Sequence, residues 1–188
     1  MFSLNVPLPP GVERLATDLH PKLSGFDRVR ERRTLVGKRF GVADVRSGEG
    51  EGGGREGNRD APPREEALDR LRERLRRPLS GTDPFEVAVT RIDTFDAPRS
   101  GSRPVVYLAV ESDELVRLHR RLCASFGAVE GIEGDDYVPH VTLARGGEPE
   151  PGAVAGLVDA EFDPVRWRVH ALDVWDPEFR EVAASVEL

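Results

Sequence analysis

The chain has 188 residues, the size of one domain or of two small lobes that share a core. With 38% apolar and 32% charged residues it has the composition of an ordinary soluble globular protein, and its apolar runs are too short to cross a membrane. Its net charge of −7 argues against broad, non-specific binding to nucleic acid or to an anionic membrane. A polyanion would therefore have to bind locally, in a basic groove on an acidic body.

The single cysteine, Cys123, excludes an intramolecular disulfide and a Cys-rich zinc or iron–sulfur site, and it favours a cytoplasmic location. We expect Cys123 to be buried as a small apolar side chain on its helix. The first six residues have neither the basic region nor the long apolar stretch of a signal peptide. The four histidines lack the spacing of metal ligands, so we expect no metal site.

The first part of the chain predicts a strand, a helix and a second strand. Apolar residues alternate over 2–6, which is typical of a half-buried strand. They recur at helical spacing over 12–20, where a proline ends the predicted helix. The basic run over 29–40 is predicted as one strand.

Next comes a segment with almost no apolar residues. Residues 47–63 are rich in glycine, proline and charge, and we predict a flexible loop. The loop lacks the Gly-Lys-Ser/Thr ending and the preceding apolar strand of a phosphate-binding P-loop, so that interpretation is rejected. Apolar residues on one face predict a helix over 64–79.

The rest of the chain follows a similar plan. Ser112 is a good N-cap for a helix that extends to about residue 126. A further short helix is predicted at 153–158. The predicted strands are 85–89, 105–110, 137–145, 165–175 and 181–188.

One arrangement occurs twice. Strand, helix and a strand that contains Thr-Leu appear at 2–39 and again at 105–145, with Thr34 and Thr142 in matching places. Such a duplication predicts two lobes related by a pseudo-two-fold axis, with a groove between them. We therefore expect a single α+β domain over 1–188, in which two pseudo-symmetric lobes of antiparallel sheet, backed by helices, surround a central groove.

The sequence His140-Val141-Thr142-Leu143 is the strongest candidate for chemistry. On a strand, His140 and Thr142 point to one face and their apolar neighbours to the other. An imidazole that titrates near neutrality, next to a hydroxyl donor, suits phosphoester chemistry. For an isolated motif, a strand histidine satisfied by a neighbour is an equally good interpretation.

The segment YVPHVTLAR, with the opening FSLNVPLP, the length and the order of elements, resembles the 2H phosphoesterase superfamily. Within it the chain is most similar to the LigT-like branch, the 2'-5' RNA ligase or RNA 2',3'-cyclic phosphodiesterase family. The resemblance covers nearly the whole chain. It implies two His-x-Thr/Ser motifs that face each other across the groove and need no metal or cofactor. One histidine would activate water as a base, the other would protonate the leaving ribose oxygen, and the threonines would hold the phosphate.

Carried over residue by residue, the second motif is intact and the first is not. His140 and Thr142 match the second motif, and Arg145 matches the arginine that often closes it as a phosphate or ribose contact. Thr34 matches the threonine of the first motif, but the position of its histidine holds Arg32. Loss of one general acid or base costs about 10²–10⁴ in rate.

Phosphate binding does not depend on the missing histidine. By strand alternation Arg32, Thr34 and Lys38 share a face, and arginine is suited to bidentate phosphate contacts. An alternative is that Arg32 and Arg33 are solvated strand residues at a dead site.

Two functions are therefore expected. The first is impaired, metal-free hydrolysis of a cyclic or 2'-5' ribonucleotide phosphodiester, with His140, Thr142 and Thr34 as the catalytic set. The second is a non-catalytic module that binds an RNA end or a nucleotide. For either function we expect a monomer with no membrane partner.

The remaining histidines and the tryptophans are weaker candidates. His20 fits the C-terminal end of a helix, where the dipole favours a cation. His119 is expected on a solvated helix face among arginines. His170 is a minor candidate to line the groove and substitute for the absent base. Trp167 and Trp175 are predicted in the core or the groove wall, where a tryptophan can stack on a base.

Overall fold

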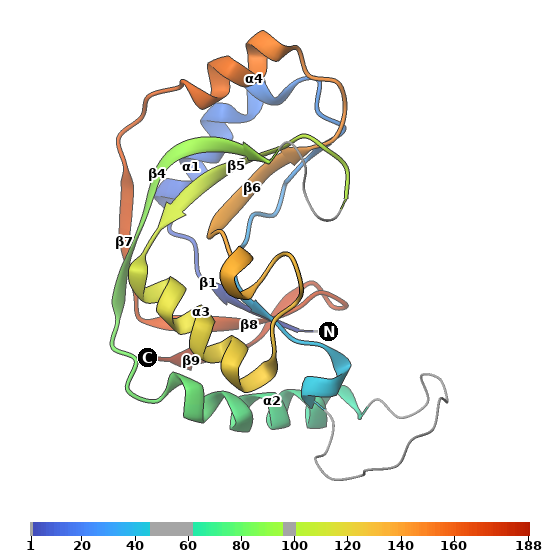
Figure 1. Cartoon of the computed structure of the whole chain (residues 1–188), viewed down its shortest axis with the longest axis vertical. Coiled ribbons are helices and arrows are strands. Elements are labelled where there is room, and N and C mark those ends of the chain that lie inside the picture. Colours follow the sequence, from blue (N-terminus) through green and yellow to red (C-terminus); the bar gives the residue numbers. More distant parts are fainter. Residues whose placement is uncertain (1, 46–61, 96–100) are drawn as a thin grey trace.

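The computed structural model describes residues 2–45, 62–95 and 101–188. Within these residues the chain forms a nine-stranded antiparallel sheet and four α-helices (Figure 1). Nearly all of the loop predicted at 47–63 lies outside the described residues. Short 3-10 helices occupy His20–Leu23, Val42–Val45 and Gly134–Asp136. The helices are α1 (Pro10–Leu19), α2 (Arg64–Leu79), α3 (Asp113–Phe126) and α4 (Pro151–Val158). The strands are β1 (Ser3–Val6), β2 (Arg28–Val29), β3 (Leu35–Arg39), β4 (Phe85–Phe95), β5 (Val105–Glu111), β6 (His140–Arg145), β7 (Val165–Val169), β8 (Ala171–Asp176) and β9 (Glu181–Glu187).

The sheet order is symmetric about its centre. The strands follow one another as β7-β4-β5-β6-β3-β1-β8-β9, and β2 also pairs with β6. The centre is the seam between β6 and β3. β5 is the next strand on one side of it and β1 is the next strand on the other, and each is followed in the chain by a helix, α3 after β5 and α1 after β1. The two predicted lobes are confirmed, and their sheets join at this seam into one curled sheet (Figure 1).

The helices lie at two ends of the molecule (Figure 1). In the view of Figure 1, α1 and α4 lie at the top, and α2 and α3 lie together at the bottom. The helix α3 begins as predicted, because the Ser112 hydroxyl accepts a hydrogen bond from the backbone N–H of Leu115 at 3.3 Å. Its apolar face, with Leu118 and Leu122, is buried, and α3 packs against β3 of the other lobe. The lobes are therefore joined by helix packing as well as by the sheet.

Two predicted strands are broken, and in each case the two pieces have different partners. The predicted strand 29–40 forms β2, which pairs with β6, and β3, which pairs mainly with β1. The predicted strand 165–175 forms β7, which pairs with β4, and β8, which pairs with β1. The chain crosses from one lobe to the other at His170, between β7 and β8. Alternation of apolar residues does not reveal such a change of partner, since it continues through both pieces.

None of the helices in the described ranges has the length and hydropathy of a membrane-crossing segment.

Candidate functional site

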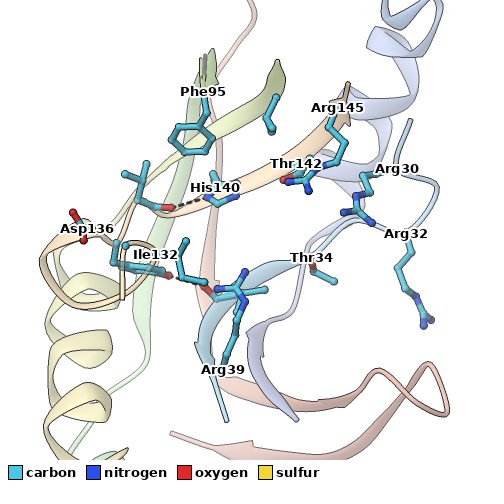
Figure 2. Close-up of a pocket in the computed structure, with 15 residues that line it drawn as sticks. Arg30, Arg32, Thr34, Arg39, Phe95, Ile132, Asp136, His140, Thr142 and Arg145 are labelled. Carbon is cyan, nitrogen blue, oxygen red and sulfur yellow. Dashed lines mark hydrogen bonds between the residues drawn. The ribbon is translucent and has the colours of Figure 1, made fainter. Parts of the chain in front are cut away.

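A pocket of about 410 Å³ lies at the seam between the two lobes (Figure 2). Its walls come from β3, β6 and the segments that precede them, from the loop between α3 and β6, and from Phe95 at the end of β4 and Val105 at the start of β5. Its charged lining residues are four arginines and one aspartate: Arg30, Arg32, Arg39, Arg145 and Asp136. An acidic chain thus has a pocket with an excess of positive charge, which favours an anionic ligand.

The strand β6 brings His140, Thr142 and Arg145 to the pocket as predicted. Simple alternation would place Arg145 on the core face together with Leu143. However, the register of β6 against β5 shifts between Thr142 and Ala144, which makes Leu143 an extra residue in the strand. A β-bulge of this kind shifts the alternation of side chains by one position. Arg145 therefore lies on the same face as Thr142.

A second bulge decides which side chains of β3 reach the pocket. The register against β1 shifts between Val36 and Lys38, with Gly37 as the extra residue. Lys38 therefore lies opposite Leu4 on the core face, whereas Arg39 takes the pocket face. The close approach of Gly37 to β1 leaves little room for a side chain, since a Cβ there would lie 3.2 Å from the Leu4 carbonyl oxygen.

The expectation that Lys38 shares the face of Arg32 and Thr34 is thus wrong. Thr34 lines the pocket, but Lys38 is 2% exposed, does not line it, and forms an ion pair with the equally buried Glu133 at 2.7 Å. Burial alone would raise the pKa of Glu133, but hydrogen bonds from Lys38 and from the backbone N–H groups of Val129 and Arg39 lower it. Glu133 is therefore ionised at neutral pH, and since Lys38 is bound to it, a phosphate contact from Lys38 has no support.

The loop between α3 and β6 is fixed to β3 by side chains. Glu133 accepts hydrogen bonds from the backbone N–H groups of Val129 in the loop (3.0 Å) and of Arg39 in β3 (2.8 Å). The Tyr137 hydroxyl donates to the Val36 carbonyl oxygen at 2.8 Å (Figure 2). These contacts hold the backbone from which Arg39 extends into the pocket.

His119 belongs to the same buried network and is not on a solvated helix face as predicted. It is fully buried, stacks on Tyr137 with ring centroids 3.7 Å apart, and donates from Nδ1 to the Gly37 carbonyl oxygen at 2.7 Å. Its Nε2 accepts from the backbone N–H of Gly134 at 2.8 Å and lies 3.3 Å from the half-buried Cys123 sulfur. Burial lowers the pKa of His119, which favours the neutral ring that this arrangement requires.

One ring nitrogen of His140 is bound to the backbone. Its Nδ1 lies 2.7 Å from the Val138 carbonyl oxygen, which accepts the proton of that nitrogen and leaves Nε2 unprotonated (Figure 2). Burial is the main cause that lowers the pKa of His140, and the positive charges of Arg39 and Arg145 lower it further against the hydrogen bond to Val138. The ring also makes an edge-to-face contact with Phe95 at 5.2 Å. A neutral imidazole with a free Nε2 can accept a proton at neutral pH.

Arg32 lies at the pocket wall but its guanidinium is directed elsewhere. It lies 4.1 Å from the centre of the Trp175 ring and donates a hydrogen bond to the Arg180 carbonyl oxygen. Figure 2 shows its side chain pointing away from His140. Arg33 is also directed away from the pocket, because it pairs with Glu13 at 2.8 Å. Neither arginine occupies the place of a second catalytic group.

Arg30 and Arg39 are the pocket cations that sequence reasoning missed. Arg28, Arg30 and Arg32 alternate along the chain, and this alternation could have predicted that Arg30 shares a face with Arg32. Arg39 had no such signal, because it reaches the pocket through the bulge at Gly37.

The other aromatic and histidine candidates lie outside the pocket. His170 is exposed between β7 and β8 and is not part of the lining, and His20 is the C-cap residue of α1, as predicted. Trp167 packs against the core, and the Arg32 guanidinium lies over the ring of Trp175. His140 is therefore the one histidine of the chain among the described residues that line the pocket.

The curled antiparallel sheet, with a histidine, a threonine and an arginine from one strand at its seam, defines a domain of the 2H phosphoesterase type. The family model of the 2'-5' RNA ligase superfamily matches residues 60–179. The chain belongs to this superfamily. The matched segment includes His140 and Thr142 but not Thr34 or Arg32.

One similar solved structure is TT0787 of Thermus thermophilus. It superposes with a TM-score of 0.61 at 20% sequence identity, over 100% of this chain and 97% of that chain. At this identity the likeness supports the fold. No curated protein matches the chain significantly.

Proposed function

We propose that the pocket binds a ribonucleotide phosphodiester, either a 2',3'-cyclic phosphate at an RNA end or a 2'-5' linkage, and hydrolyses it slowly. The observation that carries the proposal is a single neutral histidine with a free Nε2, next to a threonine hydroxyl, in a pocket with an excess of arginine. Membership of the 2'-5' RNA ligase superfamily supports the choice of substrate class.

Five of the pocket residues have a role in this proposal. His140 takes the proton of the attacking water at Nε2. The hydroxyls of Thr142 and Thr34 donate to the phosphate oxygens, and Arg145 and Arg39 balance the charge that develops on them. This scheme needs no metal or cofactor.

The weak point of this site is the leaving oxygen. Its protonation would fall to the histidine of the first motif, and the chain holds Arg32 there. Arg32 would reach the phosphate only after it leaves Trp175, and a guanidinium is a poor proton donor at neutral pH. We therefore expect turnover about 10²–10⁴ slower than with two histidines.

A second candidate function is binding without turnover. It is favoured by the same absence of a second histidine from the described pocket lining. The arginines and threonines would then hold an RNA end or a nucleotide while His140 serves as a hydrogen-bond acceptor.

The test is hydrolysis of a 2',3'-cyclic nucleotide by the purified protein, with EDTA present. Turnover that His140→Ala abolishes and that the exposed-histidine control His170→Ala preserves would support the enzyme. Because the pKa of His140 is lowered, turnover should persist below pH 6.5 and fall only as the pH passes through the lowered value. Saturable binding without turnover, weakened by His140→Ala, would establish the binding module. Neither turnover nor binding would overturn both functions.

A further inference from the structure

Three arginines gather at the end of the pocket where β2 pairs with β6. Arg28 lies directly opposite Arg145 in this antiparallel pair, and Arg30 follows two residues later, with its backbone N–H bound to the Leu143 carbonyl oxygen at 2.8 Å. Figure 2 shows the side chains of Arg30 and Arg145 next to each other, beside Thr142. Arg30 and Arg145 line the pocket, whereas Arg28, opposite Arg145 in the strand pair, is not part of the lining.

The arginine cluster, Arg28, Arg30 and Arg145, has no carboxylate partner among the ion pairs of the described residues. Other arginines do have one: Arg33 pairs with Glu13, and Arg64 pairs with Asp176. Like charges directly opposite each other on neighbouring strands destabilise a sheet.

Arg145 shows the effect of this crowding. Its burial and the charges of Arg30 and Arg28 lower the pKa of Arg145, and none of the causes acts in the opposite direction. Its Nε is buried and has no hydrogen-bond partner. The positive charges of the three arginines therefore repel one another, and the Nε–H of Arg145 has no acceptor. An anion with several acceptor oxygens would balance these charges and bind this donor.

Only part of the arginine cluster lies beside the reacting phosphate. Arg145 lies opposite Val105 of β5 and Thr142 lies opposite Tyr107, so the two are two strand positions apart, roughly 7 Å at about 3.3 Å per residue. Arg28 lies across from Arg145, on the side away from β5, since β5 and β2 pair with opposite edges of β6 at this residue. A phosphate held by Thr142 and Arg145 therefore leaves Arg28 free, and Arg145 lies between the two positions.

We propose that the arginine cluster binds a second phosphate of the substrate, so that the preferred ligand is an RNA end with a further phosphate one nucleotide away from the reacting phosphodiester. This inference rests on the proposed function, because it names the substrate of the same pocket. It implies that a bare cyclic mononucleotide occupies only part of the site. Arg28, which lies outside the pocket lining, is then a specificity-determining residue.

A matched pair of ligands tests the inference. Adenosine 2',3'-cyclic phosphate and its 5'-phosphorylated form differ by one phosphate, and the Kd of each is measured by calorimetry. We expect the 5'-phosphorylated form to bind at least about tenfold more tightly, as one or two charge-assisted contacts would give. In Arg28→Ala the ratio of the two affinities should fall towards one. The control Arg168→Ala removes an exposed arginine of β7, away from β2 and β6, and should keep the ratio.

The other outcomes separate this inference from the proposed function. Equal affinity of the wild-type protein for both ligands would overturn the second-phosphate site and leave the proposed function standing. A ratio that Arg28→Ala and Arg168→Ala reduce equally would also overturn it, since the preference would then reflect net charge alone. Binding of neither ligand would overturn the proposed function together with the inference. The thermal unfolding of each variant, compared with wild type, verifies that it is folded.

Discussion

The two strands at the centre of the sheet support the pocket in different ways. β6 is paired with β5 from His140 to Arg145, so its pocket residues stand on a regular hydrogen-bonded ladder interrupted by one bulge. β3 pairs with β6 only between Leu35 and Val141, and several of its backbone groups are bound by side chains of α3 and of the loop before β6. His140 and Thr142 lie on a strand that is paired with β5 along its whole length, whereas Arg32 and Thr34 lie before a strand that pairs with β6 at one position.

This difference shows how the β3 half depends on contacts distant in sequence. The backbone of Arg39 is held by Glu133, 94 residues further along the chain. The position of His140 depends on Val138, two residues away. The hydrogen bond that holds the His140 ring is thus local, whereas the one that holds the Arg39 backbone joins segments far apart in the chain. The following predictions act on this contrast.

The largest expected effect is on stability, at Glu133. Glu133→Ala removes one partner of a buried ion pair and leaves the Lys38 ammonium without compensation, which should cost about 3–5 kcal/mol. Urea unfolding monitored by circular dichroism measures the change. Glu73→Ala, which breaks an exposed pair with Arg76, is the control and should cost less than about 1 kcal/mol. Glu133→Gln keeps the shape and part of the hydrogen bonding, so it should lie between the two. A cost for Glu133→Ala no greater than that of the control would mean that the loop does not depend on this pair.

The next prediction concerns the first motif. Arg32→His restores the histidine two residues before Thr34 and should raise cyclic phosphodiester turnover by at least about 10²-fold, because it supplies a second acid–base group. Steady-state hydrolysis of a 2',3'-cyclic nucleotide measures it. Arg33→His is the matched control, and since Arg33 is directed towards Glu13, no gain is expected there. Unchanged turnover in Arg32→His with binding intact would show that the missing acid does not belong at this position.

The smallest effect is a pH dependence of stability through His119. Its pKa is lowered in the folded protein, mainly by burial, so the unfolded chain binds more protons than the folded one as the pH falls below about 6.5. The stabilisation is present above that pH and is lost as the pH falls through the lowered folded-state value. His119 is surrounded by Glu133, Lys38 and Arg39, of which only Glu133 favours the protonated ring.

His119→Gln should therefore show a flatter stability profile than wild type between pH 8 and 5.5, measured by urea unfolding at each pH. The contribution of His140 is present in both proteins and cancels in the comparison. Parallel profiles would contradict the prediction.

The sequence predicted the regular parts of the fold well. Alternation and helical spacing gave β1, α1, α2, β5, α3 and β6, and Ser112 identified the start of α3. These features depend on neighbours within a few residues, which is why the pattern alone is sufficient. The repeat of strand, helix and Thr-Leu strand also predicted the two lobes, because each unit folds on the same local rules.

By itself, the sequence determined the domain type and the shared face of His140 and Thr142, since the two are two positions apart on one strand. Only the tertiary structure decided that Arg39 and not Lys38 enters the pocket, that His119 is buried, and that Arg32 is directed towards Trp175. The physical reason is common to the three. An extra residue in a strand, a buried ion pair and a stacked guanidinium each depend on a partner strand or loop far away in the chain, and the periodicity of a segment holds no information about that partner.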